Sequence, residues 1–242
     1  MSKSPPVLTP FDANSPSLTE RTIEAVREAI RTRALVPGEL YSVYQLAAEL
    51  GVSRSPVRDA LLRLAETGMV RFERNRGFRV LVPGARELAE ILAVRLALEV
   101  PAARRAARIA GIPDLARLRG EYGAMEEAAS AGDEPLFLMH DQRLHALILE
   151  LAGNSYVARV IDNLRDATRL VGASTIEHSR TLHDVQREHL PIIEAVEAND
   201  PERAALAMEH HLTETGRLLL REAVLRDGAS VDVDRLWDDL VD

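Results

Sequence analysis

Apolar residues recur at helical spacing along most of the chain, which predicts a mainly α protein. In the first third, the pattern predicts three helices and then two short strands joined by a hairpin, over residues 19–33, 43–50, 53–67, 70–73 and 78–82. Beyond Pro83-Gly84 the spacing is helical throughout, with predicted helices over 86–109, 114–130, 134–151, 155–171, 183–198 and 201–226. We therefore expect a small N-terminal unit followed by an all-α helical bundle.

These patterns divide the chain into four parts. Residues 1–16 are rich in Pro and Ser and are expected to be disordered. Residues 17–83 and 84–227 form the two predicted domains, and residues 228–242 form an acidic tail with room for one more short helix. Aromatic residues make up only 4% of the chain, so the core must consist mainly of Leu, Ala, Val and Ile, as in helix bundles.

Charge and composition separate the two predicted domains further. Residues 17–83 hold eleven Arg against eight acids, whereas residues 84–242 hold eighteen Arg against twenty-nine acids and all seven histidines. The first domain thus suits an anionic partner, although the overall charge of −8 argues against a protein that coats nucleic acid.

The absence of Cys excludes disulfides and Cys-ligated zinc and favours the cytoplasm. No apolar run predicts a membrane span or a signal peptide.

Three helices followed by a hairpin is the layout of a winged helix-turn-helix, whose third helix enters the major groove of DNA. In residues 53–64 the predicted buried stripe is Val57, Ala60, Leu61 and Leu64. Arg54 and Arg58 share another face, and the helix start with Ser53 and Ser55 is a natural phosphate site. Hairpin charge comes from Arg74, Arg76 and Arg79 around Gly77. The alternative is that these arginines form an ordinary solvated surface.

In the helical part, polar residues interrupt the apolar stripes at four positions. Asp141 and His145 lie one turn apart on one predicted helix, and His189 and His211 lie on two others. A buried carboxylate is costly unless it is paired or metal-bound. Three imidazoles and a carboxylate on inward faces therefore suit a divalent ion such as Zn²⁺, Ni²⁺ or Mn²⁺. The alternative is hydrogen-bonded core histidines, and His210 competes with His211 for the inward position.

Arg95 and Glu99 interrupt the stripe of the first helix of the bundle. One interpretation is an internal Arg95–Glu99 ion pair. The other is that Arg95 grips the carboxylate of a small effector molecule. The helix over 155–171 could add Arg165 or Arg169 to such a site.

The segment RALVPGELYSVYQLAAELGVSRSPVRDALLRLAETGMVRFERNRGFRV resembles the GntR family of bacterial transcription regulators. The resemblance implies that Ser53, Arg54 and Arg58 contact the operator from the recognition helix, and that Arg76 and Gly77 contact it from the wing. Asp59 replaces the family's usual Glu, and Tyr44 stands where some relatives carry a DNA-contacting Arg.

The downstream pattern resembles the FCD ligand-binding domain of the FadR-type subfamily. Its motifs are Arg95-x-x-Leu98-Glu99, Asp141-x-x-Leu144-His145, Glu188-His189 and His211-Leu212. By this resemblance Asp141, His145, His189 and His211 hold a metal ion, and the effector is a small carboxylate metabolite.

Together these observations predict a homodimeric, ligand-responsive regulator that binds operator DNA and acts as a repressor. Two alternatives stay open. One is a metal-dependent hydrolase built on the helical domain, since three His and an Asp could activate water. The other is a helical scaffold with a vestigial, metal-free pocket.

Overall fold

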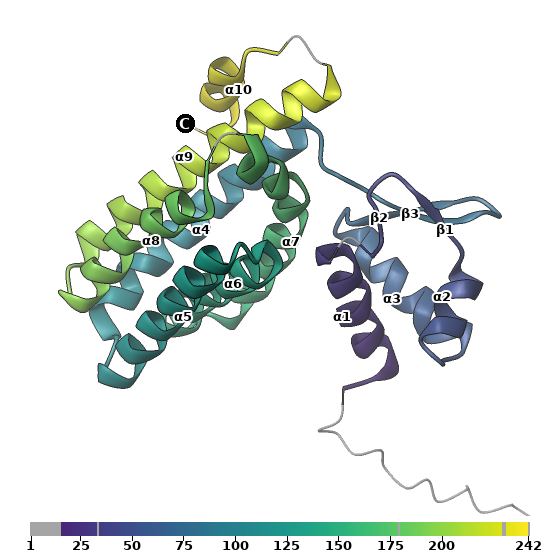
Figure 1. Cartoon of the computed structure of the whole chain (residues 1–242), viewed down its shortest axis with the longest axis horizontal. Coiled ribbons are helices and arrows are strands. Elements are labelled where there is room, and N and C mark those ends of the chain that lie inside the picture. Colours follow the sequence, from purple (N-terminus) through teal and green to yellow (C-terminus); the bar gives the residue numbers. More distant parts are fainter. Residues whose placement is uncertain (1–15, 33, 179, 229–230, 242) are drawn as a thin grey trace, which may run out of the picture.

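The computed structural model describes residues 16–32, 34–178, 180–228 and 231–241, without the side chains of Arg31 and of residues 169–179. The disorder predicted for residues 1–16 thus falls almost wholly outside the described residues. The described chain forms an N-terminal domain and a helical domain, and residues 81–84 connect them (Figure 1). No helix in the described part is long and apolar enough to cross a membrane.

The N-terminal domain contains three helices and a three-stranded antiparallel sheet, which confirms the predicted winged helix-turn-helix. Its elements are α1 (Leu18–Arg31), β1 (Leu40–Tyr41), α2 (Val43–Glu49), α3 (Arg54–Glu66), β2 (Val70–Glu73) and β3 (Gly77–Val80). The strand order is β1-β3-β2, with Tyr41 opposite Phe78 and Phe72 opposite Phe78 on the other side. The sequence did not predict β1, because two residues are too few to show a strand's alternation.

Gly77 allows the first strand to approach the hairpin. Its φ is 131°, and a Cβ placed on it would lie 1.9 Å from the carbonyl oxygen of Tyr41. No side chain fits there, because any Cβ would overlap the backbone of β1. The close approach of β1 is therefore enough to require a glycine at position 77, independently of any contact that Gly77 makes with DNA.

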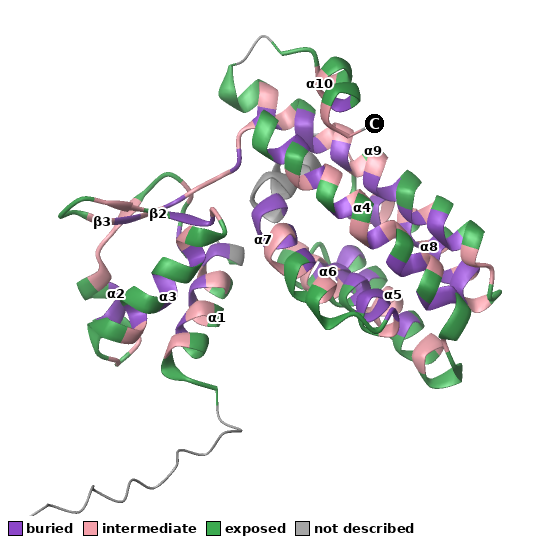
Figure 2. Ribbon diagram, turned by 180° about the vertical axis from the view of Figure 1, so that it is seen from behind, coloured by how far each residue is buried: buried purple, intermediate pink, exposed green. Residues whose placement is uncertain are grey.

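The helical domain consists of seven helices in the described residues. They are α4 (Ala85–Ile109), α5 (Ile112–Ala131), α6 (Glu134–Leu151), α7 (Ser155–His178), α8 (Leu182–Glu197), α9 (Pro201–Asp227) and α10 (Val233–Leu240). The long helices α4 and α9 pack along each other, α6 packs against α4, α8 packs against both, and α5 packs against α6 and α8. Buried residues line the inward faces of α4, α8 and α9 (Figure 2). The cluster that joins these helices consists of Leu, Ala, Ile, Val, Met and a single Phe, as the low aromatic content predicts.

Two features of the helical domain go beyond the sequence prediction: the end of α7 and an additional helix near the C-terminus. The break expected at Gly172 is wrong, because α7 continues to His178. One glycine inside a helix lowers the stability of the helix by only about 1 kcal/mol relative to alanine, so a helix can continue past it. The short helix that the acidic tail had room for is α10. Its Trp237 is buried against Gly216 of α9 and Leu92 of α4.

Candidate functional site

An exposed groove lies between α3 and the β2–β3 hairpin. The predicted stripe of α3 is buried and consists of Val57, Ala60, Leu61 and Leu64. This packing leaves Arg54 and Arg58 exposed on the outer face of the helix. Both arginines line the groove together with Tyr44 of α2 and hairpin residues 72–77. The structure thus brings together four of the residues that the sequence singled out, Arg54, Arg58, Arg76 and Gly77.

The start of α3 presents further polar groups. Ser53 has the extended backbone of an N-cap residue, and both Ser53 and Ser55 are exposed. Ser53 occupies the N-cap position, but its side chain accepts no capping hydrogen bond. The Arg58 guanidinium lies 5.7 Å from the centre of the Phe72 ring, a cation–π distance. Exposed guanidinium groups beside a helix N-terminus are the groups that contact phosphates and base edges.

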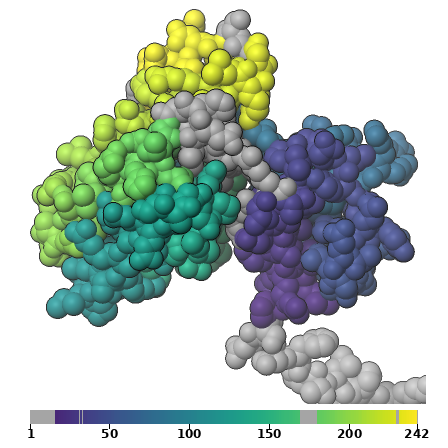
Figure 3. Space-filling view, viewed as in Figure 1, coloured from purple at the N-terminus to yellow at the C-terminus, as the bar shows by residue number. Residues whose placement is uncertain are grey.

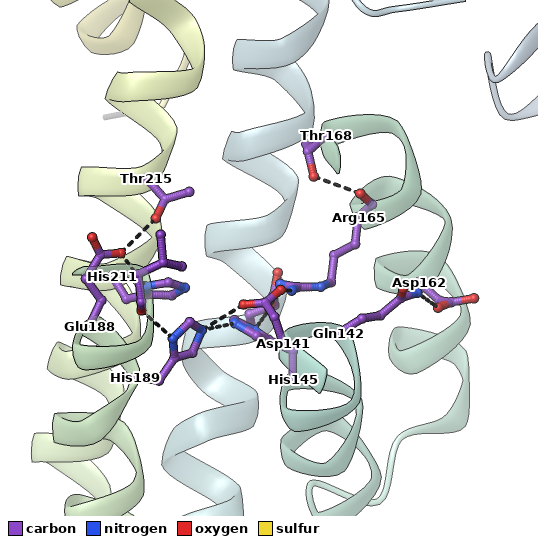
Figure 4. A network of polar contacts seen from close by, with 12 residues as sticks. Asp141, Gln142, His145, Asp162, Arg165, Thr168, Glu188, His189, His211 and Thr215 are labelled. Atoms are coloured by element: carbon purple, nitrogen blue, oxygen red, sulfur yellow. Dashed lines mark hydrogen bonds and ion pairs between the residues drawn. The ribbon is translucent and has the colours of Figure 1, made fainter. Parts of the chain in front are cut away.

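A second site lies inside the helical domain, where three helices bring three histidines together. His145 of α6, His189 of α8 and His211 of α9 are buried, and each offers a ring nitrogen within 4.8 Å of the others, so they could hold a metal ion. Asp141, one turn before His145, places Oδ1 3.0 Å from Nε2 of His189 (Figure 4). The three histidines therefore meet at one place, and Asp141 lies against one of them, His189.

Hydrogen bonds fix which nitrogen of two histidines faces this meeting point. Nδ1 of His145 lies 2.7 Å from Oε2 of Glu99, and Nδ1 of His189 lies 2.8 Å from the carbonyl oxygen of Val185. Both partners are acceptors, so each Nδ1 carries the proton. The Nε2 atoms, only 3.2 Å apart, are thus left to face each other.

Two arrangements satisfy this pair of nitrogens. In one, His189 is doubly protonated and its Nε2 donates to Asp141. In the other, a cation sits between the lone pairs. Ligands of a tetrahedral ion with bonds of about 2.0–2.1 Å lie roughly 3.3 Å apart. The separations of 3.0 Å and 3.2 Å around Nε2 of His189 are close to that value. The donor set, imidazole nitrogen plus carboxylate, also suits divalent ions.

Burial and charge keep His145 and His211 neutral and Asp141 ionised, as metal ligation requires of these groups. Burial and the nearby Arg165 guanidinium lower the pKa of His145 to about 3, so its imidazole is neutral. Burial, followed by the neighbouring His189, holds the pKa of His211 well below its usual value. Burial would raise the pKa of Asp141, but Arg165 and His189 outweigh it and keep the carboxylate ionised.

His211 is the least constrained of the three histidines. Its Nδ1 lies 3.3 Å from Oε2 of Glu188, but the geometry is not that of a hydrogen bond, and this buried atom has no hydrogen-bond partner. Glu188 itself accepts hydrogen bonds from Arg180 and Thr215. The ring of His211 is therefore less fixed by hydrogen bonds than those of His145 and His189.

Arginines line a small cavity of about 60 Å³ beside the histidines. Its wall includes Asp141, His211 and the guanidinium groups of Arg95, Arg165 and Arg180. Arg95 forms the internal ion pair with Glu99, at 2.7 Å, and also donates to Thr168. Arg95 can therefore form the ion pair with Glu99 and still line the cavity in which an effector could bind. The side chain of Arg169 lies outside the described residues, whereas Arg165 contacts Asp141 directly.

Sequence reasoning missed several parts of this site. Glu188 appeared only as part of a motif, and Arg180 and Thr168 were not singled out. Their signal in the sequence is weak. The helix phase alone does not decide the direction of Glu188 or Thr168, and Arg180 lies between α7 and α8, where no helical spacing applies. Glu99 was noted as a partner for Arg95, but not as the acceptor that orients His145.

A winged helix-turn-helix with an exposed basic groove, joined to a helical domain with a buried polar site, defines a DNA-binding transcriptional regulator. Comparison with known families agrees. Residues 18–80 match the model of the "Bacterial regulatory proteins, gntR family", and residues 90–214 match the "FCD domain". The chain belongs to the GntR family of bacterial transcriptional regulators and carries the FCD domain of the FadR-like members.

Individual relatives support the same assignment. The chain is 32% identical, over 84% of its length and 91% of the other, to the "Probable D-xylose utilization operon transcriptional repressor" of Paenarthrobacter nicotinovorans. It is 27% identical, over 74% of its length and 79% of the other, to the "HTH-type transcriptional repressor RspR" of Escherichia coli. The fold matches the solved structure of E. coli McbR/YncC with a TM-score of 0.77 and 23% identity, covering 86% of this chain and 99% of that one. The two sequence relatives are named as transcriptional repressors, and neither supports the hydrolase alternative.

Proposed function

We propose that this regulator is a homodimeric repressor whose helical domain holds a divalent metal ion and senses a small carboxylate. The observation that supports the proposal is the buried cluster of His145, His189 and His211, with Asp141 against His189, beside a cavity lined with arginines. A site of this kind is expensive to bury without a function, because each polar group must be desolvated.

Asp141, His145, His189 and His211 would hold the ion, with Zn²⁺, Ni²⁺ or Mn²⁺ as the candidates for this donor set. A bound ion would supply a positive centre to which a carboxylate oxygen of the effector could attach. Glu99 and the carbonyl oxygen of Val185 keep the two Nε2 atoms turned inward, as outer partners of metal-bound histidines do.

Arg95 and Arg165 are the proposed effector-binding residues of the described chain. Their guanidinium groups line the cavity and can donate paired hydrogen bonds to a carboxylate. Arg169 stays a candidate on the sequence alone. The effector would bind one arrangement of the protein more tightly than another and so shift the DNA-competent population.

Arg54, Arg58 and Arg76, with Ser53, Ser55 and Gly77, form the proposed DNA-contacting surface. Two copies related by a two-fold axis would place two recognition helices on the two halves of an inverted-repeat operator. Residues 17–83 have a net charge of only +3, so a single N-terminal domain would bind DNA weakly. Dimerisation would raise the affinity, because binding of the first domain increases the effective concentration of the second at the DNA. The names of the two curated relatives support repression as the direction of control.

Elemental analysis and carboxylate screening of the full-length protein test this proposal. We expect about one metal ion per chain after purification without chelator. We also expect small carboxylates to raise the melting temperature more in the metal-loaded protein than after treatment with EDTA. Absence of metal together with no melting shift on adding Zn²⁺ or Ni²⁺ would favour the vestigial pocket instead.

A further inference from the structure

One arginine of the N-terminal domain reaches across to the helical domain. Helix α1 packs against α7, and the two domains meet on this side (Figure 3). From α1, Arg27 places Nη1 3.0 Å from Oδ2 of Asp162 and Nε 3.2 Å from Oδ2 of Asp166, and it also contacts the side-chain oxygen of Asn163. The Arg27 side chain is 14% exposed and that of Asp166 is 2% exposed, so water screens this ion pair little, whereas the Asp162 side chain is 45% exposed.

A neighbouring face of the same helix contributes to the wall of the candidate metal and effector site. Arg165, next to Asp166 in the chain, extends from α7 toward Asp141 and contacts its carboxylate (Figure 4). The same guanidinium lies 3.8 Å from Glu99. Helix α7 thus carries Arg27's partners on one face and an arginine of the buried site on another.

A second contact ties α7 to the ligand-bearing helix α6. Gln142, the residue after Asp141, donates from Nε2 to Oδ1 of Asp162 at 2.8 Å. The Asp162 carboxylate is therefore shared between α6 and Arg27. A displacement of residues 141 and 142 would act on α7 at two points, Arg165 and Asp162, which lie three residues apart. A rigid helix can carry such coupling between sites.

We propose that Arg27 is a positioning residue that couples occupancy of the buried site to the DNA-binding domain. It is not placed in the DNA-facing groove or among the proposed ligands of the ion. It holds α1, and with it the three-helix core that carries α3, in a position set by Asp162 and Asp166. Ligation of Asp141 would change its hold on Arg165, shift α7, and so reposition α1. This inference rests on the proposed function, since it requires a ligand in the buried site.

The test uses full-length protein, Zn²⁺ as the site ligand, and a DNA duplex that the wild-type protein selects from a random pool. The measured quantity is the ratio of the duplex dissociation constants with and without saturating Zn²⁺, with Zn²⁺ affinity measured separately by calorimetry. Coupling of the usual strength would make this ratio differ from one by about fivefold or more in the wild-type protein. In Arg27→Ala the ratio should fall to within about twofold of one, with Zn²⁺ affinity unchanged.

Three further variants make the outcome specific. Arg27→Lys keeps the charge but loses the fork that spans two carboxylates, so it should give an intermediate ratio. Asp166→Asn removes the charge of Arg27's partner and should also reduce the ratio. If Arg27→Ala does not fold, Arg27→Lys and Asp166→Asn still test the proposal. Arg21→Ala removes an exposed arginine from the same helix and should keep the wild-type ratio.

The possible failures are distinguishable. A wild-type ratio in Arg27→Ala, or a wild-type protein that binds Zn²⁺ with a ratio of one, overturns the coupling and leaves the metal site standing. A merely structural bridge would weaken duplex binding equally with and without Zn²⁺, which also overturns the coupling. A wild-type protein that binds no Zn²⁺ overturns the proposed metal site, and this inference with it.

Discussion

The two domains use arginine in opposite settings. In the N-terminal domain Arg54 and Arg58 are exposed above an apolar core, and no buried charge depends on them. In the helical domain Arg95 and Arg165 are buried among carboxylates, and each is part of the packing. An exposed arginine can be removed at the cost of its ligand contacts alone. A buried one leaves an unpaired partner behind, so its removal changes stability and binding together.

Removal of a central ligand should give the largest effect in the buried site. In His189→Ala we expect metal affinity to fall by more than about 100-fold, because one of four ligands is lost. Binding of a selected duplex in the absence of metal should stay within about twofold of wild type. A competition titration against a metal-binding dye measures the first quantity and fluorescence anisotropy the second.

His210→Ala is the matched control, because His210 is the exposed neighbour of His211 on α9. It should leave metal affinity unchanged. Equal losses in the two histidine variants would mean that His189 is not a ligand and that the histidine cluster is ordinary core.

The exposed site should respond more simply. In Arg58→Ala we expect duplex affinity to fall about 30-fold, which corresponds to about 2 kcal/mol for a lost base or phosphate contact. The melting temperature should stay near the wild-type value, since the side chain is exposed. Arg63→Ala, an exposed arginine in the last turn of the same helix, serves as the control and should lower affinity by less than threefold. Unchanged affinity in Arg58→Ala would remove this residue from the DNA-contacting surface.

The same contrast explains how far the sequence could predict each site. The face of α3 follows from helical spacing, because an apolar core selects one stripe and leaves the arginines outside. The four inward polar residues of α6, α8 and α9 were also predictable, since each interrupts an apolar stripe. Spacing could not predict which tautomer each histidine adopts or that Arg165 pairs with Asp141. Those depend on how separate helices pack, which no single helix encodes.

Glu99 tests whether the outer partners of the histidines matter. In Glu99→Gln we expect metal affinity to fall about tenfold, because the carboxylate that accepts from Nδ1 of His145 also makes that imidazole a better ligand. The free energy of unfolding should fall too, since Arg95 and Arg165 lose a buried counter-charge. Calorimetric metal titration and urea unfolding measure the two effects.

Glu121 offers a matched control for that substitution. It lies 2.7 Å from Nδ1 of His140, the same contact at the same distance, but away from the buried site. Glu121→Gln should leave metal affinity at the wild-type value. If both variants lose affinity equally, the effect of Glu99 is one of overall charge and not of orienting His145.

Tyr44 gives the smallest expected effect and the sharpest test of the exposed groove. Its side chain is 69% exposed and lines the groove with Arg54 and Arg58, at a position where some relatives carry arginine. A phenol can donate one hydrogen bond to a phosphate but brings no charge.

In Tyr44→Phe we therefore expect duplex affinity to fall about threefold, the equivalent of one modest hydrogen bond. The slope of log Kd against log salt should not change, because no counterion is released through an uncharged group. Tyr44→Arg should steepen that slope by about one and tighten binding at low salt. If Tyr44→Phe binds like wild type and Tyr44→Arg leaves the slope unchanged, the start of α2 does not reach the DNA.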